Sequence, residues 1–267
     1  MVGGFLEIER DGPVVIVTLN RPAERNAITD VSQCREIVAL CGDLAEDRSV
    51  RAMVLTGAGT AFCAGGNIKQ MRDREGTFAG TPYDQRSAYR TTFQTIANAL
   101  YALEVPVVAA INGPAIGLGL DIACMCDIRI MSSAATVAES YVKLGIIPGG
   151  GGAWALPRVI GLARASQLTL TGELIDAATA LQYGLVSEIV EPDVLIDRAR
   201  AIAATIAANP GHATRMAKRL IREGMDMKLP TALEMAAAYQ ALSHHTADHL
   251  EAVDAFLARR QPELLDR

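Results

Sequence analysis

The stretch "AINGPAIGLGLDIACMCDIRIM" at residues 110–131 decides the fold, because it places a glycine-rich turn between a buried strand and a helix. Apolar runs predict a strand over residues 107–111, a helix over 118–125 and a second strand over 127–131. A buried strand that leads through glycines into a helix is the repeating unit of α/β layering. We therefore expect an α/β protein.

A second glycine-rich stretch, "TGAGTAFCAGGNIKQM" at residues 56–71, has the same arrangement. It follows a short apolar run at residues 52–56 that predicts another buried strand. Upstream, residues 5–10 and 14–19 are β-rich and flank the turn sequence "DGP", so they predict a hairpin. Thr29 is a suitable N-cap for the next helix, whose apolar face carries Ile37, Val38, Cys41 and Leu44.

The predicted secondary structure changes near residue 192, from mixed strands and helices to helices alone. Residues 1–191 form the predicted α/β core, and residues 192–267 form a predicted helical section. Its helices are expected over residues 193–208, 212–224 and 231–259, separated by breaks that contain proline. The section is rich in Ala and poor in aromatic residues, which suits packing on another subunit. Residues 72–84 are charged and glycine-rich, so we expect a mobile surface loop there.

Composition is typical of an acidic globular protein. Of the 267 residues 50% are hydrophobic, and the net charge is −5, which argues against disorder and against nucleic-acid binding. Charged residues interrupt the N-terminus before an apolar secretion signal could form. The most apolar stretch, residues 105–126, contains Asn, Pro, Gly and Asp, which is wrong for a membrane span. We therefore expect a cytoplasmic protein whose five cysteines are reduced, buried thiols.

Several common catalytic motifs do not occur in the sequence. It has no phosphate-binding P-loop and no serine-hydrolase elbow, and its glycine pairs lack the third glycine of a dinucleotide-binding fingerprint. All four histidines lie near the C-terminus, where His245 and His249 look like part of a solvated helix face rather than metal ligands. We therefore expect no metal site, and we assign acid–base chemistry to carboxylate, Tyr or Lys side chains.

The two glycine-rich stretches have two possible roles. Each exposes backbone N–H groups at the start of a helix, and two such groups from different strand ends could converge as an oxyanion hole. Alternatively, the glycines only permit tight turns. The residues alone do not decide between these roles.

The two glycine-rich stretches, together with three further motifs, resemble those of the crotonase family, also called the enoyl-CoA hydratase/isomerase family. The resemblance covers nearly the whole chain, and its motifs are long and ordered. They are "NRPAERNAI" at 20–28, "AFCAGGNIKQM" at 61–71, "INGPAIGLGLDIACMCDIRI" at 111–130, "LGIIPGGGGAWALPRVIG" at 144–161 and "GLVSEIVEP" at 184–192.

The resemblance implies a β-β-α spiral core with a helical C-terminal section that builds homotrimers, often paired as a dimer of trimers. It also implies a coenzyme A thioester as substrate and no separate cofactor. By position in the motifs, the backbone N–H groups of Gly66 and Leu118 would hold the thioester oxygen. The neighbouring residues would run beside the coenzyme A, namely Ala64, Gly65, Asn67 and Ile68. Leu118 departs from the glycine common at its position, which a backbone donor tolerates.

The acid–base residues depart further from the family pattern. Family hydratases carry two Glu residues where this chain has Asp121 and Tyr141, and an unperturbed Tyr is a poor base at neutral pH. Glu139 lies two residues before Tyr141, and in an extended segment both side chains point the same way. Asp121 and Glu139 could then form a carboxylate pair. Alternatively, Asp121 is a helix-terminal carboxylate and Glu139 a surface or subunit-contact charge.

Three functional hypotheses follow from this pattern. The first is an enoyl-CoA hydratase that stabilises a thioester enolate, and its runner-up is an enoyl-CoA double-bond isomerase. The isomerase pattern is incomplete too, because Gly149 stands where dienoyl isomerases of the family add an acid. The second is a catalytically weak acyl-CoA-binding homologue, suggested by Tyr141. The third, RNA binding, is disfavoured by the net charge of −5. Tyr141 and Trp154 suggest a pocket for a bulky or aromatic acyl group.

Overall fold

A six-stranded sheet forms the centre of the computed structural model, which describes residues 4–265. The sheet order is β1-β2-β3-β4-β6-β9, and only the β1–β2 hairpin is antiparallel. Its strands are β1 (Leu6–Asp11), β2 (Val14–Leu19), β3 (Ala52–Gly57), β4 (Val107–Ile111), β6 (Ile128–Ser132) and β9 (Glu188–Val190). The predicted hairpin and the predicted buried strands are therefore confirmed.

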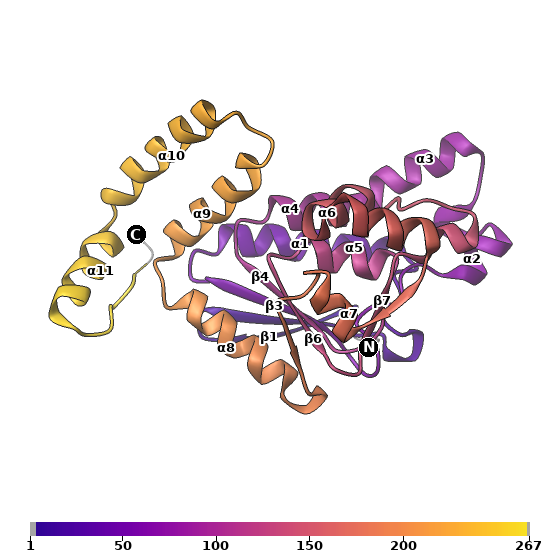
Figure 1. The fold of residues 1–267 in the computed structure, drawn as a ribbon, viewed down its shortest axis with the longest axis horizontal. Helices are drawn as coiled ribbons and strands as arrows, with labels where there is room; N and C mark the ends of the chain where they lie inside the picture. The colour runs from indigo at the N-terminus through magenta and orange to yellow at the C-terminus, as the bar shows by residue number, and fades with distance from the viewer. Residues whose placement is uncertain (1–3, 266–267) are drawn as a thin grey trace.

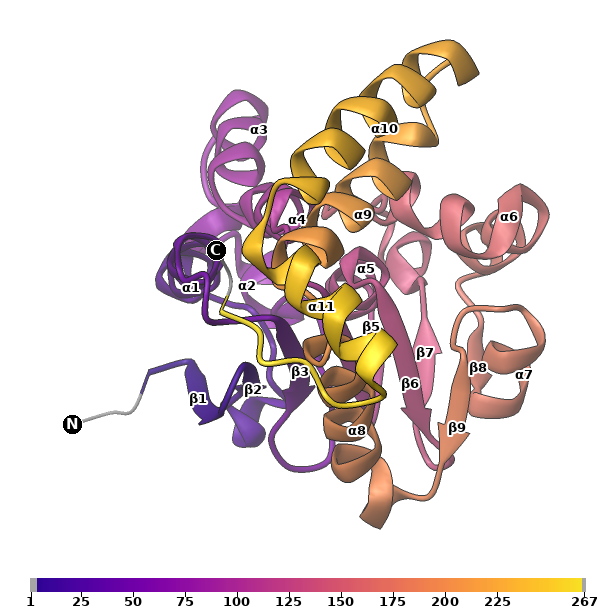
Figure 2. The same cartoon turned by 90° about the vertical axis from the view of Figure 1, so that its left-hand side faces the viewer.

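A smaller sheet lies beside the β6–β9 edge of the larger one (Figure 2). It has the order β5-β7-β8 and consists of β5 (Ala115–Ile116), β7 (Thr136–Ala138) and β8 (Leu174–Asp176). An isolated bridge between Cys63 and Ala115 ties the loop after β3 to this sheet. The two glycine-rich stretches of the sequence are therefore brought side by side.

Helices cover both faces of the large sheet. The α-helices of the described residues are α1 (Val31–Glu46), α2 (Ile68–Asp73), α3 (Pro82–Thr91), α4 (Phe93–Ala102), α5 (Leu118–Met125), α6 (Gly152–Thr171), α7 (Ala177–Gln182), α8 (Leu195–Ala207), α9 (Gly211–Gly224), α10 (Leu229–His244) and α11 (Ala247–Ala258). Short 3₁₀ helices occur at η1 (Pro22–Glu24), η2 (Gly76–Phe78), η3 (Ser140–Leu144) and η4 (Pro192–Val194). The predicted α/β class is confirmed.

Alternation along the strands explains the two layers. Successive residues of a strand point to opposite faces. Val14 and Ile16 of β2 pack in the cluster under α8, whereas Val15 and Val17 pack in the larger core with α1, α4 and α5. Figure 1 shows α8 on one side of the strands and α1, α4 and α5 on the other. The strands are consequently buried on both faces, as a parallel sheet requires.

Three local predictions were wrong. The N-cap of α1 is Asp30, whose carboxylate accepts from Ser32 N, and not Thr29. Residues 72–84 are not one loop, because they contain the end of α2, all of η2 and the start of α3, which Thr81 caps. The single helix expected over residues 231–259 is two helices, because Thr246 leaves the helical conformation and caps α11. Short polar side chains that bond to the backbone explain all three differences.

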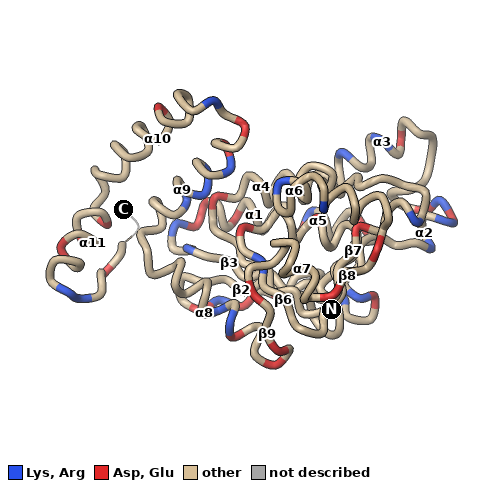
Figure 3. The backbone as a smooth tube through the Cα atoms, viewed as in Figure 1, with Lys and Arg blue, Asp and Glu red and all other residues tan. Residues whose placement is uncertain are grey.

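Helices α10 and α11 form an arm that extends away from the α/β body (Figure 1), and we call residues 229–258 the arm. No side chain of α10 is buried, and Figure 3 shows few charged residues along this helix. Large apolar side chains of the arm are exposed, including Leu229, Leu233, Leu242, Leu250, Phe256 and Leu257. In contrast, α8 also follows residue 192 but packs directly on the sheet.

Within residues 4–265, no helix is both long enough and apolar enough to cross a membrane. All five cysteines are free and buried, so the prediction that they lie in the protein interior is confirmed.

Candidate active site

The site begins where the loops after β3 and β4 meet. Cys63 N donates to Pro114 O at 3.1 Å, and Ile116 N donates to Cys63 O at 3.0 Å. Gly65 has a φ of +86° and lies so close to the second loop that a Cβ there would be 2.6 Å from Ile116 O. At this position glycine is required by both conformation and close approach. The same hypothetical Cβ would be 3.5 Å from Leu118 N, so the two loops meet beside the start of α5.

The backbone N–H groups of Gly66 and Leu118 are the two predicted oxyanion donors. Leu118 is the first residue of α5, and its N-cap Gly117 has a φ of 53°. Among residues 4–265, neither of these two N–H groups donates to a backbone or side-chain acceptor. The start of a helix also carries positive potential. The structure therefore offers two free donors on adjoining loops.

The residues predicted to run beside coenzyme A form the entry to α2. Asn67 is the N-cap of α2 and accepts from Lys69 N at 2.9 Å, and the Ile68 side chain is 59% exposed. The preceding backbone is fixed by two bonds, Ala64 N to Arg25 O at 3.0 Å and Ile28 N to Gly65 O at 2.8 Å. This stretch is therefore held in place by the earlier "NRPAERNAI" segment.

Asn26 supports this arrangement and was not identified from the sequence. It is fully buried and has a φ of 57°, a conformation that Asn tolerates better than most residues. Its amide donates to Ala58 O at 2.9 Å and to Ala61 O at 2.8 Å, and its oxygen accepts from Arg21 N at 2.9 Å. One side chain thus ties the loop after β2 to the loop after β3.

The predicted acid–base residues converge. Asp121 lies one turn after Leu118 on α5 and is 1% exposed, and Glu139 follows β7 and is 0% exposed. The Tyr141 hydroxyl donates to Asp121 Oδ2 at 2.8 Å. The remaining carboxylate oxygens, Asp121 Oδ1 and both of Glu139, have no hydrogen-bond partner within the described part of the chain. Buried oxygens without partners are rare outside functional sites.

The backbone conformation at Glu139 and Tyr141 differs from the extended segment that was predicted. Glu139 (φ −96°, ψ 61°) is the N-cap of η3, and Tyr141 lies inside this 3₁₀ helix, so the segment is not extended. The turn brings both side chains to Asp121 nonetheless. The exposure of 0% also contradicts the alternative that Glu139 is a surface charge of the single chain.

Burial sets the protonation of this cluster. It raises the pKa of Asp121 above the ordinary 3.8, and the bond from Tyr141 opposes that rise. Burial and the neighbouring Asp121 charge raise the pKa of Glu139 still further above its ordinary 4.5. Burial also raises the pKa of Tyr141 well above 10.0, so its hydroxyl stays a donor. Both shifts favour the protonated forms of the carboxyl groups, and the titration of such a close pair belongs to the pair rather than to either residue alone.

Aromatic side chains that were not predicted from the sequence lie close to the site. Phe78, Tyr89 and Phe93 form a cluster with ring centroids 5.3–6.4 Å apart. A Cβ at Gly66 would be 3.8 Å from the Phe78 ring, and one at Gly149 would be 2.9 Å from the Tyr89 ring. These rings come from η2, α3 and α4, and of the three only Phe78 lies in the segment that was expected to be a loop.

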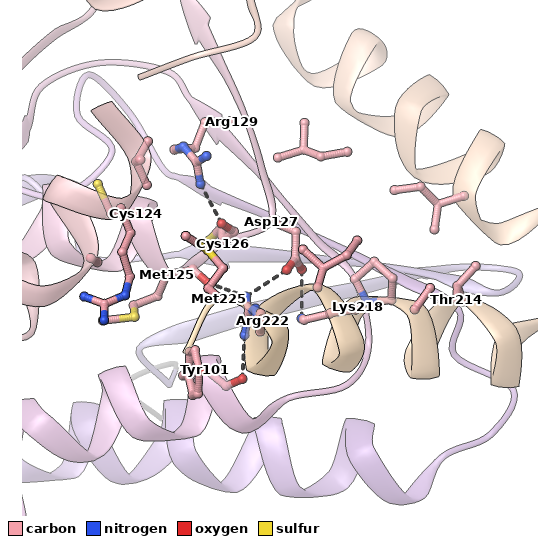
Figure 4. Close-up of a pocket in the computed structure, with 18 of the residues that line it drawn as sticks. Tyr101, Cys124, Met125, Cys126, Asp127, Arg129, Thr214, Lys218, Arg222 and Met225 are labelled. Atoms are coloured by element: carbon pink, nitrogen blue, oxygen red, sulfur yellow. Dashed lines mark hydrogen bonds and ion pairs between the residues drawn. The ribbon is translucent and has the colours of Figure 1, made fainter. Parts of the chain in front are cut away.

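A separate cavity of about 490 Å³ lies between α9, α6 and the start of β6 (Figure 4). Lys218 and Arg222 of α9 both pair with Asp127 at 2.8 Å, and Lys218 also donates to Val105 O at 2.7 Å. Burial lowers the pKa of Lys218 to about 8. Trp154 lines this cavity, 39% exposed, and packs against Tyr101 rather than against the carboxyl pair. The cavity thus lacks the carboxyl pair and the free N–H donors.

The histidines gather at the corner between α10 and α11. His244 Nδ1 and His249 Nε2 are 3.0 Å apart, and His212 Nε2 lies 2.9 Å from Thr246 Oγ1. Residues 4–265 contain no group of three or more His, Cys, Asp or Glu side chains arranged to hold a metal ion. The histidines therefore serve as hydrogen-bonding groups of this corner in the structure.

Comparison with known proteins is consistent across sequence and structure. The sequence profile of the family described as enoyl-CoA hydratase/isomerase matches residues 9–267. A short-chain-enoyl-CoA hydratase of Clostridium acetobutylicum is 37% identical over 257 residues, covering 96% of this chain and 95% of the relative. A 1,2-epoxyphenylacetyl-CoA isomerase of Escherichia coli is 34% identical, covering 94% of each chain. The crystal structure of an enoyl-CoA hydratase from Bacillus anthracis superposes with a TM-score of 0.92 at 34% identity, covering 98% of this chain and 100% of the other.

Proposed function

Given that the chain belongs to the enoyl-CoA hydratase/isomerase family and is therefore an acyl-CoA-processing enzyme, we propose that it hydrates an enoyl-CoA thioester. The observation that carries this proposal is the convergence of Asp121 and Glu139, three of whose carboxylate oxygens have no hydrogen-bond partner among residues 4–265. Syn addition of water needs two carboxyl groups that hold one water molecule, one as base and one as acid. Asp121 and Glu139 would take those roles in place of the two hydratase glutamates.

The thioester carbonyl would lie between the N–H groups of Gly66 and Leu118. Negative charge that develops on this oxygen as the enolate forms would receive two hydrogen bonds, each worth about 3 kcal/mol of barrier lowering. The coenzyme A would run along Ala64, Gly65, Asn67 and Ile68. The exposed Ile68 side chain and the rigid backbone before it support that path.

The proton balance of the proposed step is simple. Asp121, as carboxylate, takes a proton from water while the water oxygen bonds to the β-carbon. The electron pair of the double bond moves to the α-carbon through the enolate, and Glu139 gives that carbon its proton. Tyr141 keeps its own proton and donates to Asp121 Oδ2, which favours the charged, basic form of that carboxyl.

Double-bond isomerisation is the second candidate, and one observation favours it. The two carboxyls are 1% and 0% exposed, an environment in which a proton can move between carbons of the substrate without exchange with solvent. In this case Asp121 would remove a proton from one carbon and the pair would return a proton to another. The resemblance to a 1,2-epoxyphenylacetyl-CoA isomerase is compatible with this alternative.

The arm suggests an assembly of identical chains. Large exposed apolar surfaces often mark interfaces, and the arm exposes several large apolar side chains, including Phe256, which is 83% exposed. The proposed state is a homotrimer or a dimer of trimers, with the arm packed on another subunit. Light scattering coupled to size exclusion measures the mass directly. A monomer at micromolar concentration would contradict this proposal.

One experiment separates the candidate activities. The purified protein is incubated in heavy water with crotonyl-CoA, a 3-enoyl-CoA and a saturated acyl-CoA. A hydratase converts crotonyl-CoA to the 3-hydroxy product with one deuterium at the α-carbon, whereas an isomerase moves the 3-enoyl double bond. Tight binding of every thioester without turnover or α-exchange would support the catalytically weak homologue and reject the enzymatic proposal.

Variants test the carboxyl pair itself. Asp121→Asn and Glu139→Gln should each lose most activity while still binding a saturated acyl-CoA, because the N–H donors are untouched. Glu46→Gln, a change at an exposed carboxylate of α1, is the matched control and should keep full activity. Full activity of Glu139→Gln alongside an inactive Asp121→Asn would show that Asp121 works without Glu139.

A further inference from the structure

Gly152 stands at the point where the two carboxyls meet. A Cβ built on this glycine would be 2.1 Å from Asp121 Oδ1 and 2.2 Å from Glu139 Oε1. Both distances are far below any real carbon–oxygen contact. Because Asp121 Oδ1 and Glu139 Oε1 both lie this close to the same point, the distance between them cannot exceed the sum of the two distances. The carboxyl groups therefore occupy the space that a side chain at position 152 would need.

Space alone excludes a side chain at position 152. Gly152 is the first residue of α6 and is not among the glycines with positive φ, so its backbone suits any L-amino acid. Gly151 is different, because its φ of 118° already favours glycine. A side chain at position 150 is excluded by contact, because a Cβ there would be 2.6 Å from Asp121 Oδ2. Asp121 is thus flanked on its two oxygens by Gly150 and Gly152.

The close approach of two carboxyls in a buried place has a chemical consequence. Two negative charges this close cannot both persist out of water. Asp121 Oδ1 and both Glu139 oxygens have no donor within the described chain. A single proton between Asp121 and Glu139 would remove the repulsion and give one oxygen of each group a partner.

We infer that Gly152 is a positioning residue, whose lack of a side chain lets Asp121 and Glu139 approach closely enough to share one proton. The inference rests on the proposed function for its catalytic meaning but not for its structural content. In the proposed hydration, Asp121 ends the turnover protonated and Glu139 ends it ionised. The O–H bond on Asp121 then breaks as one forms on Glu139, and the pair is reset without a proton from solvent.

The test compares wild type with Gly152→Ala, and Gly42→Ala is the control. Gly42 lies in α1 with nothing within 4 Å of a hypothetical Cβ, so its change should leave both activity and fold unaltered. In Gly152→Ala the methyl group should separate the carboxyls and lower kcat about 100-fold, as a misplacement of roughly 1 Å does at catalytic groups. Binding of butyryl-CoA should persist, because Gly66 and Leu118 are unaffected.

A measurement on the unliganded protein tests the shared proton directly. Infrared difference spectra of glutamate-labelled wild type should show a protonated carboxyl band at neutral pH that is absent in Glu139→Gln. In Gly152→Ala the band should shift, and the two apparent pKa values of the kcat profile should move closer together. The triple variant Asp121→Ala/Glu139→Ala/Gly152→Ala removes both carboxyl groups that the methyl group would contact, and it should recover folding if Gly152→Ala alone misfolds.

Several results would overturn the inference. They are a folded Gly152→Ala with the kcat and pH profile of wild type, a wild type without the protonated band, and a misfolded Gly152→Ala whose folding the triple variant does not recover. The infrared result does not depend on turnover. A protein with the shared-proton band but no activity on any thioester would reject the proposed function and leave the role of Gly152 intact.

Discussion

Tyr141→Phe offers a sharp test of how the carboxyl pair is controlled. The change removes the hydroxyl that donates to Asp121 Oδ2 at 2.8 Å and leaves the ring in place. A hydrogen bond to a charged group in a buried site is worth about 1.5–3 kcal/mol. Since 1.36 kcal/mol corresponds to one pH unit, the pKa of Asp121 should rise by roughly one to two pH units.

The sign of the effect follows from the proposed role of Asp121 as base. Only the ionised form takes a proton, so activity falls as the pH drops through the pKa of Asp121, which burial already holds above 3.8. In Tyr141→Phe the acidic limb of the kcat profile should move to higher pH by roughly one to two pH units. The plateau at high pH should be retained.

The assay is hydration of crotonyl-CoA across the pH range, and Tyr83→Phe is the control. Tyr83 is 74% exposed on α3, so its change should leave the profile in place. An acidic limb of Tyr141→Phe that coincides with wild type, or that moves to lower pH, would refute the reasoning. If the variant instead loses activity equally at every pH, Tyr141 acts on the substrate and not through Asp121.

Three further predictions concern stability. Burial raises the pKa of Glu139 above 4.5, so folding favours its protonated form. The wild-type protein therefore loses stability as the pH rises above 4.5 towards the raised pKa of the folded state. Glu139→Gln lacks this titration, so its melting temperature should fall less than that of wild type between about pH 5 and pH 8. Lys218→Met breaks a buried pair with Asp127 and should cost about 3 kcal/mol in urea unfolding, whereas the exposed Lys228→Met should cost almost nothing. Asn26→Ala removes the three hydrogen bonds of a buried side chain and should cost at least about 2 kcal/mol in urea unfolding. It should also weaken butyryl-CoA binding in calorimetry, and unchanged binding would contradict the supporting role of Asn26.

The large elements of this fold could be predicted because their signals are local. The buried strands around residues 52–57 and 107–111 are continuous apolar runs, and glycine follows each of them. The break at Thr246 could not be predicted with equal ease, because Thr is tolerated inside helices and only its bond with His249 N reveals the cap. Local side-chain competition for backbone groups decides such boundaries.

The sequence predicted which candidate residues lie close together better than it predicted their geometry. Motif position suggested Gly66, Leu118 and Asp121 as site residues, and the spacing of Glu139 from Tyr141 suggested that these two share a pocket. The assumed extended backbone was wrong, since η3 turns there. The crowding at Gly152 depends on three segments that are distant in sequence, α5, η3 and α6, so the sequence gives only a run of four glycines as a hint.

The arm has a consequence for how the protein behaves on dilution. A helix of 16 residues is only marginally stable in water by itself, and α10 buries none of its side chains within its own chain. If neighbouring subunits supply the missing contacts, the helical order of α10 depends on protein concentration while that of the sheet does not. Hydrogen exchange measured along a dilution series would then show α10 losing protection first, so that assays at nanomolar enzyme would observe a partly melted molecule.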